Sequence, residues 1–267
     1  MALRSLCQGT IFGDVSGSGW PLTIGLHGWG RDRADMAPPL DGLPGTVATL
    51  DLPGSGSSPP PPEAWGAREY AVVVAAAVEE LLADVTKKSG AGPAAAGEGQ
   101  ALLVGHSMGG RVAVCLAAER PELVSGLVLA GVPLLRLDPP GGGRGRPALA
   151  FRVARRLNRW HLLPDARMEA MRQRYGSADY AAAQGVMRQV LVRMVGESYD
   201  DELARLRCPV ALVWGARDTA APVAVARRAD TLIPTPHTLD VVDDATHDVH
   251  TSHPGLLRSR AESLLPT

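Results

Sequence analysis

The chain has 267 residues, enough for one large domain or two small ones whose core needs no disulfide bonds or metal ions. Lys and Arg total 27 against 28 Asp and Glu, and this net charge of −1 argues against a strongly basic nucleic-acid-binding protein. The hydrophobic fraction of 45% and the charged fraction of 21% are typical of a globular protein, not a disordered one.

Short apolar runs, each ending in a turn signal, alternate with longer helical patterns along the chain. The predicted strands are residues 22–26, 46–50, 101–104, 126–130, 210–214 and 238–242. The predicted helices are residues 67–86, 108–119, 222–232 and 253–265. Strands that are apolar on both faces are typical of a parallel sheet covered on both sides. The pattern therefore predicts an α/β fold with a doubly wound, mostly parallel sheet.

Two stretches interrupt this alternation. Residues 89–100 are rich in Gly and Ala and are predicted to form a surface loop. Residues 133–207 contain helical patterns and no strand candidate, with a linker and possible hinge at 139–143, and they carry 14 Arg against 8 Asp and Glu. We expect a core domain formed by residues 1–132 and 208–267, and a helical insertion at 133–207.

The segment Gly-His-Ser-Met-Gly at 105–109 fits the pattern Gly-x-Ser-x-Gly. It follows a predicted strand and begins a predicted helix, and a turn this tight holds the serine hydroxyl at the top of a sheet. Ser107 is therefore the predicted nucleophile. The alternative is that Ser107 only caps the helix.

A serine hydroxyl needs a base to accept its proton, and the base needs a carboxylate to orient it. His247 follows the last predicted strand, and Asp218 follows the strand before it. The order Ser107, Asp218, His247 along the chain is the one expected for a nucleophile on this type of turn. Asp218 could instead be a solvated turn residue.

His247, His250 and His253 also allow a metal-binding interpretation. Their spacing lacks the Glu of a zinc-protease helix, and the nearby carboxylates are Asp244 and Asp248. We therefore expect no metal and no organic cofactor.

An oxyanion formed at Ser107 needs two backbone donors. The amide that directly follows the nucleophile belongs to Met108. The second is expected from the loop His-Gly-Trp-Gly at 27–30, where Trp29 is the natural donor.

Five motifs in this order resemble the α/β-hydrolase fold superfamily, in the branch with a serine nucleophile and a cap. They are Leu-His-Gly-Trp-Gly at 26–30, Asp-Leu-Pro-Gly-Ser-Gly-Ser-Ser at 51–58, Gly-His-Ser-Met-Gly-Gly at 105–110, Trp-Gly-Ala-Arg-Asp at 214–218 and Thr-His at 246–247. The resemblance implies that the insertion at 133–207 is a helical cap over the site. Thr246 stands where such chains usually have Gly.

Arg111 extends the motif to Ser-x-Gly-Gly-Arg, which resembles the menaquinone-pathway synthase branch of the same superfamily. In that branch the Arg helps to hold a carboxylated substrate, which implies an anionic substrate here. The alternative is an Arg with no such role. The predicted substrate-binding residues are His27, Gly28, His106 and Arg111.

The predicted function is a serine hydrolase that cleaves an ester or thioester of a small acyl substrate. The alternatives are a lyase or carbon–carbon bond enzyme that uses the same three residues, a cofactor-free perhydrolase, and a binding protein. Cys7, Cys115 and Cys208 are too scattered for a disulfide framework, which favours the cytoplasm. No segment is apolar enough to span a membrane, and we expect a monomer or a homodimer that binds no nucleic acid.

Overall fold

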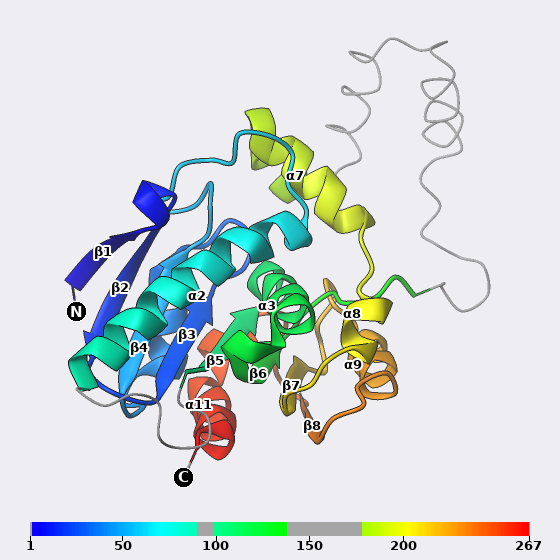
Figure 1. Ribbon diagram of the computed structural model, residues 1–267. Helices are drawn as coiled ribbons and strands as arrows, with labels where there is room; N and C mark the ends of the chain where they lie inside the picture. The colour runs from blue at the N-terminus through cyan, green and yellow to red at the C-terminus, as the bar shows by residue number, and fades with distance from the viewer. Residues whose placement is uncertain (1, 90–98, 138–177, 267) are drawn as a thin grey trace, which may run out of the picture.

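The computed structural model describes residues 2–89, 99–137 and 178–266 (Figure 1). Eight strands of these residues form one sheet in the order β1-β2-β4-β3-β5-β6-β7-β8. The six parallel strands are β3 (Leu22–Leu26), β4 (Thr46–Asp51), β5 (Ala101–His106), β6 (Val124–Ala130), β7 (Val210–Gly215) and β8 (His237–Val242). All six were predicted, and the mostly parallel, doubly wound sheet is confirmed.

The two strands that the sequence did not predict are β1 (Ala2–Leu6) and β2 (Ile11–Gly17). β1 pairs with β2, and β2 pairs with β4, both in antiparallel fashion. Antiparallel strands can keep one face in water, so polar residues and glycines interrupt their apolar pattern. Neither β1 nor β2 has a continuous apolar run like those of the six predicted strands, because they contain Arg4, Ser5, Asp14 and Ser16.

Helices cover both faces of the sheet (Figure 1). One face carries α2 (Ala67–Ser89), α3 (Met108–Glu119) and α9 (Val223–Asp230), and the other carries α1 (Ala37–Leu40), α10 (Val249–Ser252) and α11 (Pro254–Leu264). Side chains of the central strands point alternately to the two faces of the sheet. Leu103 of β5 packs in the core beneath α2 and α3, whereas Leu102 and Val104 pack in the core beneath α1 and α11. This two-residue period explains why the strands are apolar throughout.

Parallel strands bring distant segments of the chain to one edge of the sheet. The loop after β3 contains His27, β5 leads directly into Ser107, and the loops after β7 and β8 contain Asp218 and His247. The sheet therefore gathers all the predicted catalytic residues at the carboxyl ends of its strands.

The insertion between β6 and β7 contains α6 (Ala178–Ala182), α7 (Gly185–Gly196) and α8 (Asp200–Ala204). Its residues 138–177, which include the predicted linker at 139–143, lie outside the described residues, as do residues 90–98 of the predicted surface loop. α7 lies beside the start of α2 (Figure 1), where Arg193 donates to the Ala64 carbonyl at 2.7 Å and Glu197 accepts from the Ala67 amide at 3.0 Å.

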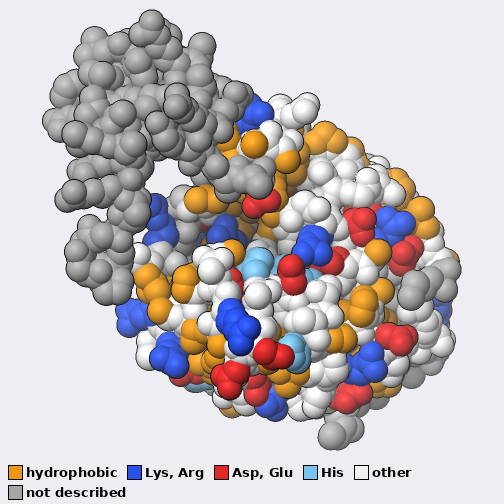
Figure 2. Space-filling model, turned by 180° about the vertical axis from the view of Figure 1, so that it is seen from behind, with side chains coloured by type: hydrophobic (Ala, Val, Ile, Leu, Met, Phe, Trp, Pro, Cys, Tyr) orange, Lys and Arg blue, Asp and Glu red, His pale blue; other side chains and the backbone are white. Residues whose placement is uncertain are grey.

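The surface seen in Figure 2 mixes acidic and basic side chains, and the described residues form no large area of one sign of charge on this face. Among the described helices, none combines the length and the apolar character needed to cross a bilayer.

Candidate active site

Ser107 occupies a strained turn between β5 and α3. Its backbone has φ 48° and ψ −111°, in a region that costs a residue other than glycine about 1–3 kcal/mol. The Ser107 amide donates to the Ala130 carbonyl at 3.0 Å, and the Gly109 amide donates to the His27 carbonyl at 3.0 Å. A Cβ atom on Gly109 would lie 2.2 Å from the Leu26 carbonyl oxygen, so only glycine permits this close approach.

Ser107, His247 and Asp218 lie in one chain of hydrogen bonds. Ser107 Oγ is 3.0 Å from His247 Nε2, and His247 Nδ1 is 2.8 Å from Asp218 Oδ2. Because the carboxylate can only accept, Nδ1 carries the proton and the lone pair of Nε2 is left for the serine hydroxyl. The structure therefore brings these three predicted residues together over 140 residues of sequence.

The Asp218 carboxylate is buried, and both of its oxygens accept hydrogen bonds from protein groups. Its Oδ1 accepts from the amides of Ala220 and Ala221 at 2.8 and 2.7 Å, which leaves Oδ2 for His247. The turn after β7 thus fixes the orientation of the carboxylate before any substrate binds.

Gly131, at the end of β6, lies directly against the Asp218–His247 pair. It has φ +54°, and an added Cβ would lie 3.2 Å from Asp218 Oδ2 and 3.3 Å from His247 Nδ1. Gly131 was not among the predicted site residues. A glycine directly after a parallel strand that neighbours the nucleophile strand was the available signal.

The two predicted oxyanion donors have free amides. Within the described residues, neither the Met108 amide nor the Trp29 amide donates a hydrogen bond to a protein group. Gly28 lies against Ser107, since a Cβ there would be 3.3 Å from Ser107 Cβ. The amide of Arg31 donates to the Gly28 carbonyl at 3.3 Å and closes the turn that carries Trp29.

His27 is fully buried, and both nitrogens of its ring contact the main chain. Nδ1 lies 2.7 Å from the Gly28 carbonyl oxygen, and Nε2 accepts from the Leu52 amide at 3.0 Å. Burial lowers the pKa of His27, which agrees with an Nε2 that must accept. Both ring nitrogens are thus engaged by the main chain, which holds the loop at 27–30 against Leu52, and the predicted contact of His27 with a substrate stays a prediction.

His106 is also buried, with 2% of its surface exposed. Its Nε2 lies 3.1 Å from the main-chain carbonyl oxygen of His247, and its ring stacks on that of His250. Burial, followed by the charges of His250 and His247, lowers the pKa of His106 well below its usual value. His106 therefore contacts the main chain of His247, and its predicted contact with a substrate stays a prediction.

Arg111 reaches from α3 to the start of the insertion and to α7. Its Nε donates to the Pro133 carbonyl at 3.0 Å and its Nη1 to the Met194 carbonyl at 2.8 Å. Burial lowers the pKa of Arg111, and its guanidinium lies 6.0 Å from the centre of the Tyr199 ring. These contacts anchor the insertion, whereas the predicted contact with a substrate carboxylate stays a prediction.

The histidines considered as metal ligands have separate partners. His247 contacts Ser107 and Asp218, His253 Nε2 lies 3.5 Å from Asp244, and His250 Nε2 lies 2.6 Å from Asp35. Their side chains do not converge on one point in the part of the chain that the structure describes.

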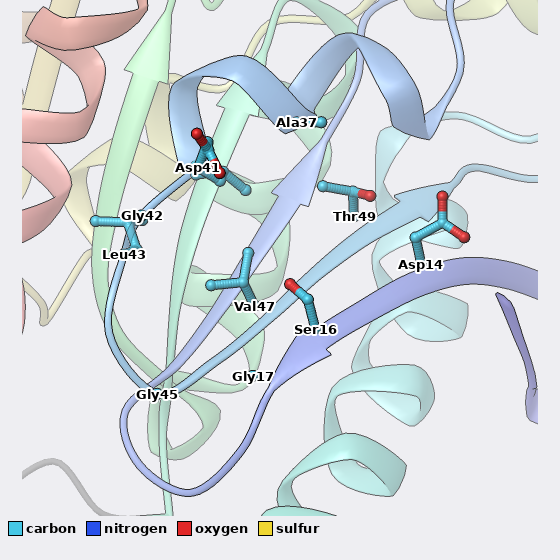
Figure 3. Close-up of a pocket in the computed structure, with 11 residues that line it drawn as sticks. Asp14, Ser16, Gly17, Ala37, Asp41, Gly42, Leu43, Gly45, Val47 and Thr49 are labelled. Carbon is cyan, nitrogen blue, oxygen red and sulfur yellow. The ribbon is translucent and has the colours of Figure 1, made fainter. Parts of the chain in front are cut away.

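A small cavity of about 80 Å³ lies away from these residues (Figure 3). It is lined by residues of β2, β4 and the segment 37–45, among them Asp14, Asp41 and Thr49. None of Ser107, Asp218 and His247 lines it, so we do not assign it to the candidate active site.

Comparison with known proteins agrees with the fold and its motifs. The model of the alpha/beta hydrolase family matches residues 24–260. The chain belongs to this family. Among curated proteins, it is 28% identical over 243 residues to the dihydrolipoyllysine-residue acetyltransferase component of the acetoin cleaving system of Cupriavidus necator. That match covers 86% of this chain and 60% of the relative.

A second curated relative is the biotin biosynthesis bifunctional protein BioHC of Cellvibrio japonicus. It is 32% identical over 111 residues, which are 40% of this chain and 18% of the relative. The chain thus spans less than two thirds of either curated protein.

Solved structures share the fold of this member of the alpha/beta hydrolase family. An esterase of Exiguobacterium antarcticum has a TM-score of 0.69 at 19% identity, with 98% of each chain covered. An enzyme that degrades N-acyl homoserine lactones has a TM-score of 0.68 at 18% identity, with 98% of this chain and 99% of the other covered.

Proposed function

We propose that the protein is a serine hydrolase that cleaves a carboxylic ester or thioester through an acyl-enzyme on Ser107. The observation that carries the proposal is the pair of hydrogen bonds, 3.0 and 2.8 Å long, that link Ser107 to His247 and His247 to Asp218. Membership of the alpha/beta hydrolase family supports the same reaction class.

The first half of the reaction forms the acyl-enzyme. Ser107 Oγ attacks the substrate carbonyl while His247 Nε2 takes its proton, and Asp218 stabilises the imidazolium. The oxyanion accepts hydrogen bonds from the amides of Met108 and Trp29, next to the positive end of the α3 dipole. The carbonyl then reforms, and His247 gives its proton to the alcohol or thiol that leaves.

The second half removes the acyl group. Water attacks the ester on Ser107 while His247 accepts its proton, and a second oxyanion collapses to the free acid. His247 returns the proton to Ser107 Oγ, so the enzyme is restored and the reaction needs only side chains, main-chain amides and water.

The substrate is a small acyl compound, and residues 133–207 act as a cap over its binding site. The insertion leaves the sheet after Gly131, which lies against Asp218 and His247, so it begins at the catalytic edge. Its 14 Arg against 8 Asp and Glu favour a negatively charged substrate.

The test is covalent labelling with a fluorophosphonate probe, followed by intact-mass measurement. We expect one adduct on the unmodified protein and none on Ser107→Ala. Ser263→Ala, in the C-terminal helix, is the matched control and should be labelled like the unmodified protein. Labelling of Ser107→Ala, or no labelling of either protein, would contradict the proposal.

A panel of p-nitrophenyl esters and acyl thioesters, varied in chain length and charge, then identifies the substrate class. Activity that depends on Ser107 with neutral esters and increases with anionic ones would support both the reaction and the role of the cap.

Biotin biosynthesis is the second candidate function, favoured by the 32% identity to BioHC over 111 residues. The test uses a Cellvibrio japonicus strain that lacks BioHC. The strain is given this chain together with the part of BioHC that this chain does not match, and its growth is measured without biotin. Growth that is lost with Ser107→Ala would support this role, and no growth would contradict it.

A further inference from the structure

Four side chains behind the catalytic residues form a continuous chain of contacts. Arg31 Nη1 donates to Asp35 Oδ1 at 3.0 Å, and Asp35 Oδ2 lies 2.6 Å from His250 Nε2. The ring of His250 stacks on the ring of His106, with centroids 3.6 Å apart and planes inclined by 22°. We refer to Arg31, Asp35, His250 and His106 as the positioning chain.

The positioning chain ends at the main chain of His247, the proposed base. His106 Nε2 lies 3.1 Å from the main-chain carbonyl oxygen of His247. A carbonyl oxygen only accepts, so Nε2 of His106 must carry the proton. His106 is also joined by a peptide bond to Ser107, so it connects the proposed nucleophile to the main chain of the proposed base.

The ring of His106 has no other hydrogen bond to hold it. Its Nδ1 is buried without a hydrogen-bond partner among the described residues, as is Nδ1 of His250. On one side the ring contacts Gly28, where an added Cβ would lie 2.6 Å from His106 Nδ1. The His250 ring is the stacked contact that can keep the imidazole in the plane needed to reach His247.

His250 lies in the short segment 248–250, and both ends of this segment are held by side chains. Its Nε2 donates to Asp35, and Arg31 donates both to Asp35 and to Asp248 Oδ1, the latter at 2.6 Å. Asp248 directly follows His247. The same guanidinium therefore stabilises the carboxylate that orients His250 and the loop that carries the base.

These groups do not form a metal site, although Asp35, His106 and His250 offer donor atoms within 4.8 Å of one another. The two rings are stacked and nearly parallel, so the lone pairs in their planes run side by side and do not meet at one point. The 2.6 Å contact between His250 and Asp35 is a hydrogen-bond distance. Two ligands about 2 Å from one tetrahedral ion would lie farther apart.

We propose that the His250 ring, oriented by Asp35 and Arg31, holds His106 against the His247 carbonyl and thereby sets the distance between Ser107 Oγ and His247 Nε2. His250 is a positioning residue, because it acts through His106 and touches neither substrate nor the reacting atoms. This inference rests on the proposed function of Ser107 and His247.

Three substitutions at His250 separate the ring stack from the hydrogen bond to Asp35. His250→Phe keeps a ring over His106 but loses the hydrogen bond. His250→Gln keeps a donor for Asp35 but loses the ring, and His250→Ala loses both. The Phe and Gln variants both fill the buried site, so their comparison remains valid if His250→Ala does not fold.

The first measurement is the hydrolysis of p-nitrophenyl butyrate, with kcat and KM determined separately. Misplacement of a catalytic group by about 1 Å costs on the order of 100-fold in rate. We expect His250→Gln and His250→Ala to lower kcat by about 10- to 100-fold with KM changed less than about twofold, and His250→Phe to stay within about threefold of the unmodified protein. Equal kcat in the Phe and Gln variants, or a loss confined to KM, would overturn the proposal.

The second measurement does not depend on the hydrolase activity. In protein labelled with ¹⁵N-histidine, the Nε2–H of His106 should exchange slowly with solvent in the unmodified protein and in His250→Phe, and rapidly in His250→Gln. If the unmodified protein neither hydrolyses esters nor reacts with fluorophosphonate, the proposed function fails. The exchange of this N–H then still decides whether His250 positions His106.

Discussion

The imidazole of His106 donates a hydrogen bond to the main-chain carbonyl of His247, 3.1 Å away. His106 directly precedes Ser107 in the chain, so the two residues of the Ser107–His247 contact are also joined through His106. Substitutions around His106 and His247 that touch no substrate are therefore expected to change the geometry of the site.

Asp218→Asn should lower kcat more than its small change in shape suggests. The Asn oxygen will take the place of Oδ1 and accept from the amides of Ala220 and Ala221, so its NH₂ group will face His247 Nδ1. Nδ1 must then accept, and Nε2 will carry its proton toward Ser107. We expect kcat to fall by about 10³- to 10⁴-fold with a small change in KM, measured on p-nitrophenyl esters.

The control for this prediction is Asp240→Asn. Asp240 lies in β8 and forms an ion pair with Arg260 of α11. Its replacement should leave kcat unchanged. A kcat for Asp218→Asn within tenfold of the unmodified protein would contradict the role assigned to the carboxylate.

Gly131→Ala should impair catalysis as well as stability. The new Cβ would lie 3.2 Å from Asp218 Oδ2 and 3.3 Å from His247 Nδ1, and the backbone has φ +54°. Backbone strain should cost about 1 kcal/mol of unfolding free energy. Displacement of the Asp218–His247 pair should lower kcat by about tenfold or more.

Gly42→Ala is the matched control for Gly131→Ala. Gly42 also has a positive φ, +82°, but the nearest atom to an added Cβ is 4.0 Å away, on Arg258. Urea unfolding should show similar destabilisation in both variants, whereas kcat should fall only in Gly131→Ala. Equal activity in the two would mean that Gly131 does not constrain the catalytic pair.

Stability should fall as the pH drops below about 6.5, the usual pKa of an unfolded histidine. Burial lowers the pKa values of His27 and His106 in the folded protein, so the unfolded chain binds more protons in that range. The stabilisation is present above about pH 6.5 and is lost as the pH falls toward the folded-state values. Urea unfolding at pH 7.5, 6.5 and 5.5 measures it.

His27→Gln should reduce this pH dependence, because one of the two buried histidines no longer titrates. His253→Gln is the control, since His253 is partly exposed and its side chain contacts Ser252 and Asp244. A slope that is unchanged by His27→Gln and reduced by His253→Gln would contradict the assignment.

Arg111→Met should loosen the insertion. The substitution removes two hydrogen bonds from a charged donor to the carbonyls of Pro133 and Met194, each worth about 1.5–3 kcal/mol. We expect a lower unfolding free energy and faster proteolysis within the insertion.

The same variant tests the predicted contact between Arg111 and a substrate carboxylate. If Arg111 only anchors the insertion, the ratio of KM values for an anionic and a neutral ester should be the same in Arg111→Met and the unmodified protein. A rise of about tenfold in KM for the anionic ester alone would support direct binding.

Much of the catalytic edge could be predicted because each residue is tied to a local pattern. Ser107 lies in a motif that requires small neighbours, and Asp218 and His247 each follow a short apolar strand. The helices bury one face against the sheet, so their apolar residues recur every three to four positions. The central strands are buried on both faces and are therefore apolar throughout. Both patterns are visible in the sequence.

The rest depends on contacts between segments that no local pattern connects. Asp35, His106 and His250 lie in three separate parts of the chain, and nothing in their neighbours indicates that the two rings stack. Gly131 was not predicted, because its place against Asp218 becomes visible only when β6 and β7 pair. The antiparallel strands β1 and β2 contain polar residues and lacked the apolar signal of the central strands.

Arg111 holds Pro133 and Met194 with a single guanidinium, so two segments that lie far apart in sequence are fastened to the helix that follows Ser107. A single substitution at residue 111 therefore removes an anchor from both segments at once. Of the two, α7 keeps a second attachment through its contacts with Ala64 and Ala67, whereas Pro133 loses the guanidinium that held it.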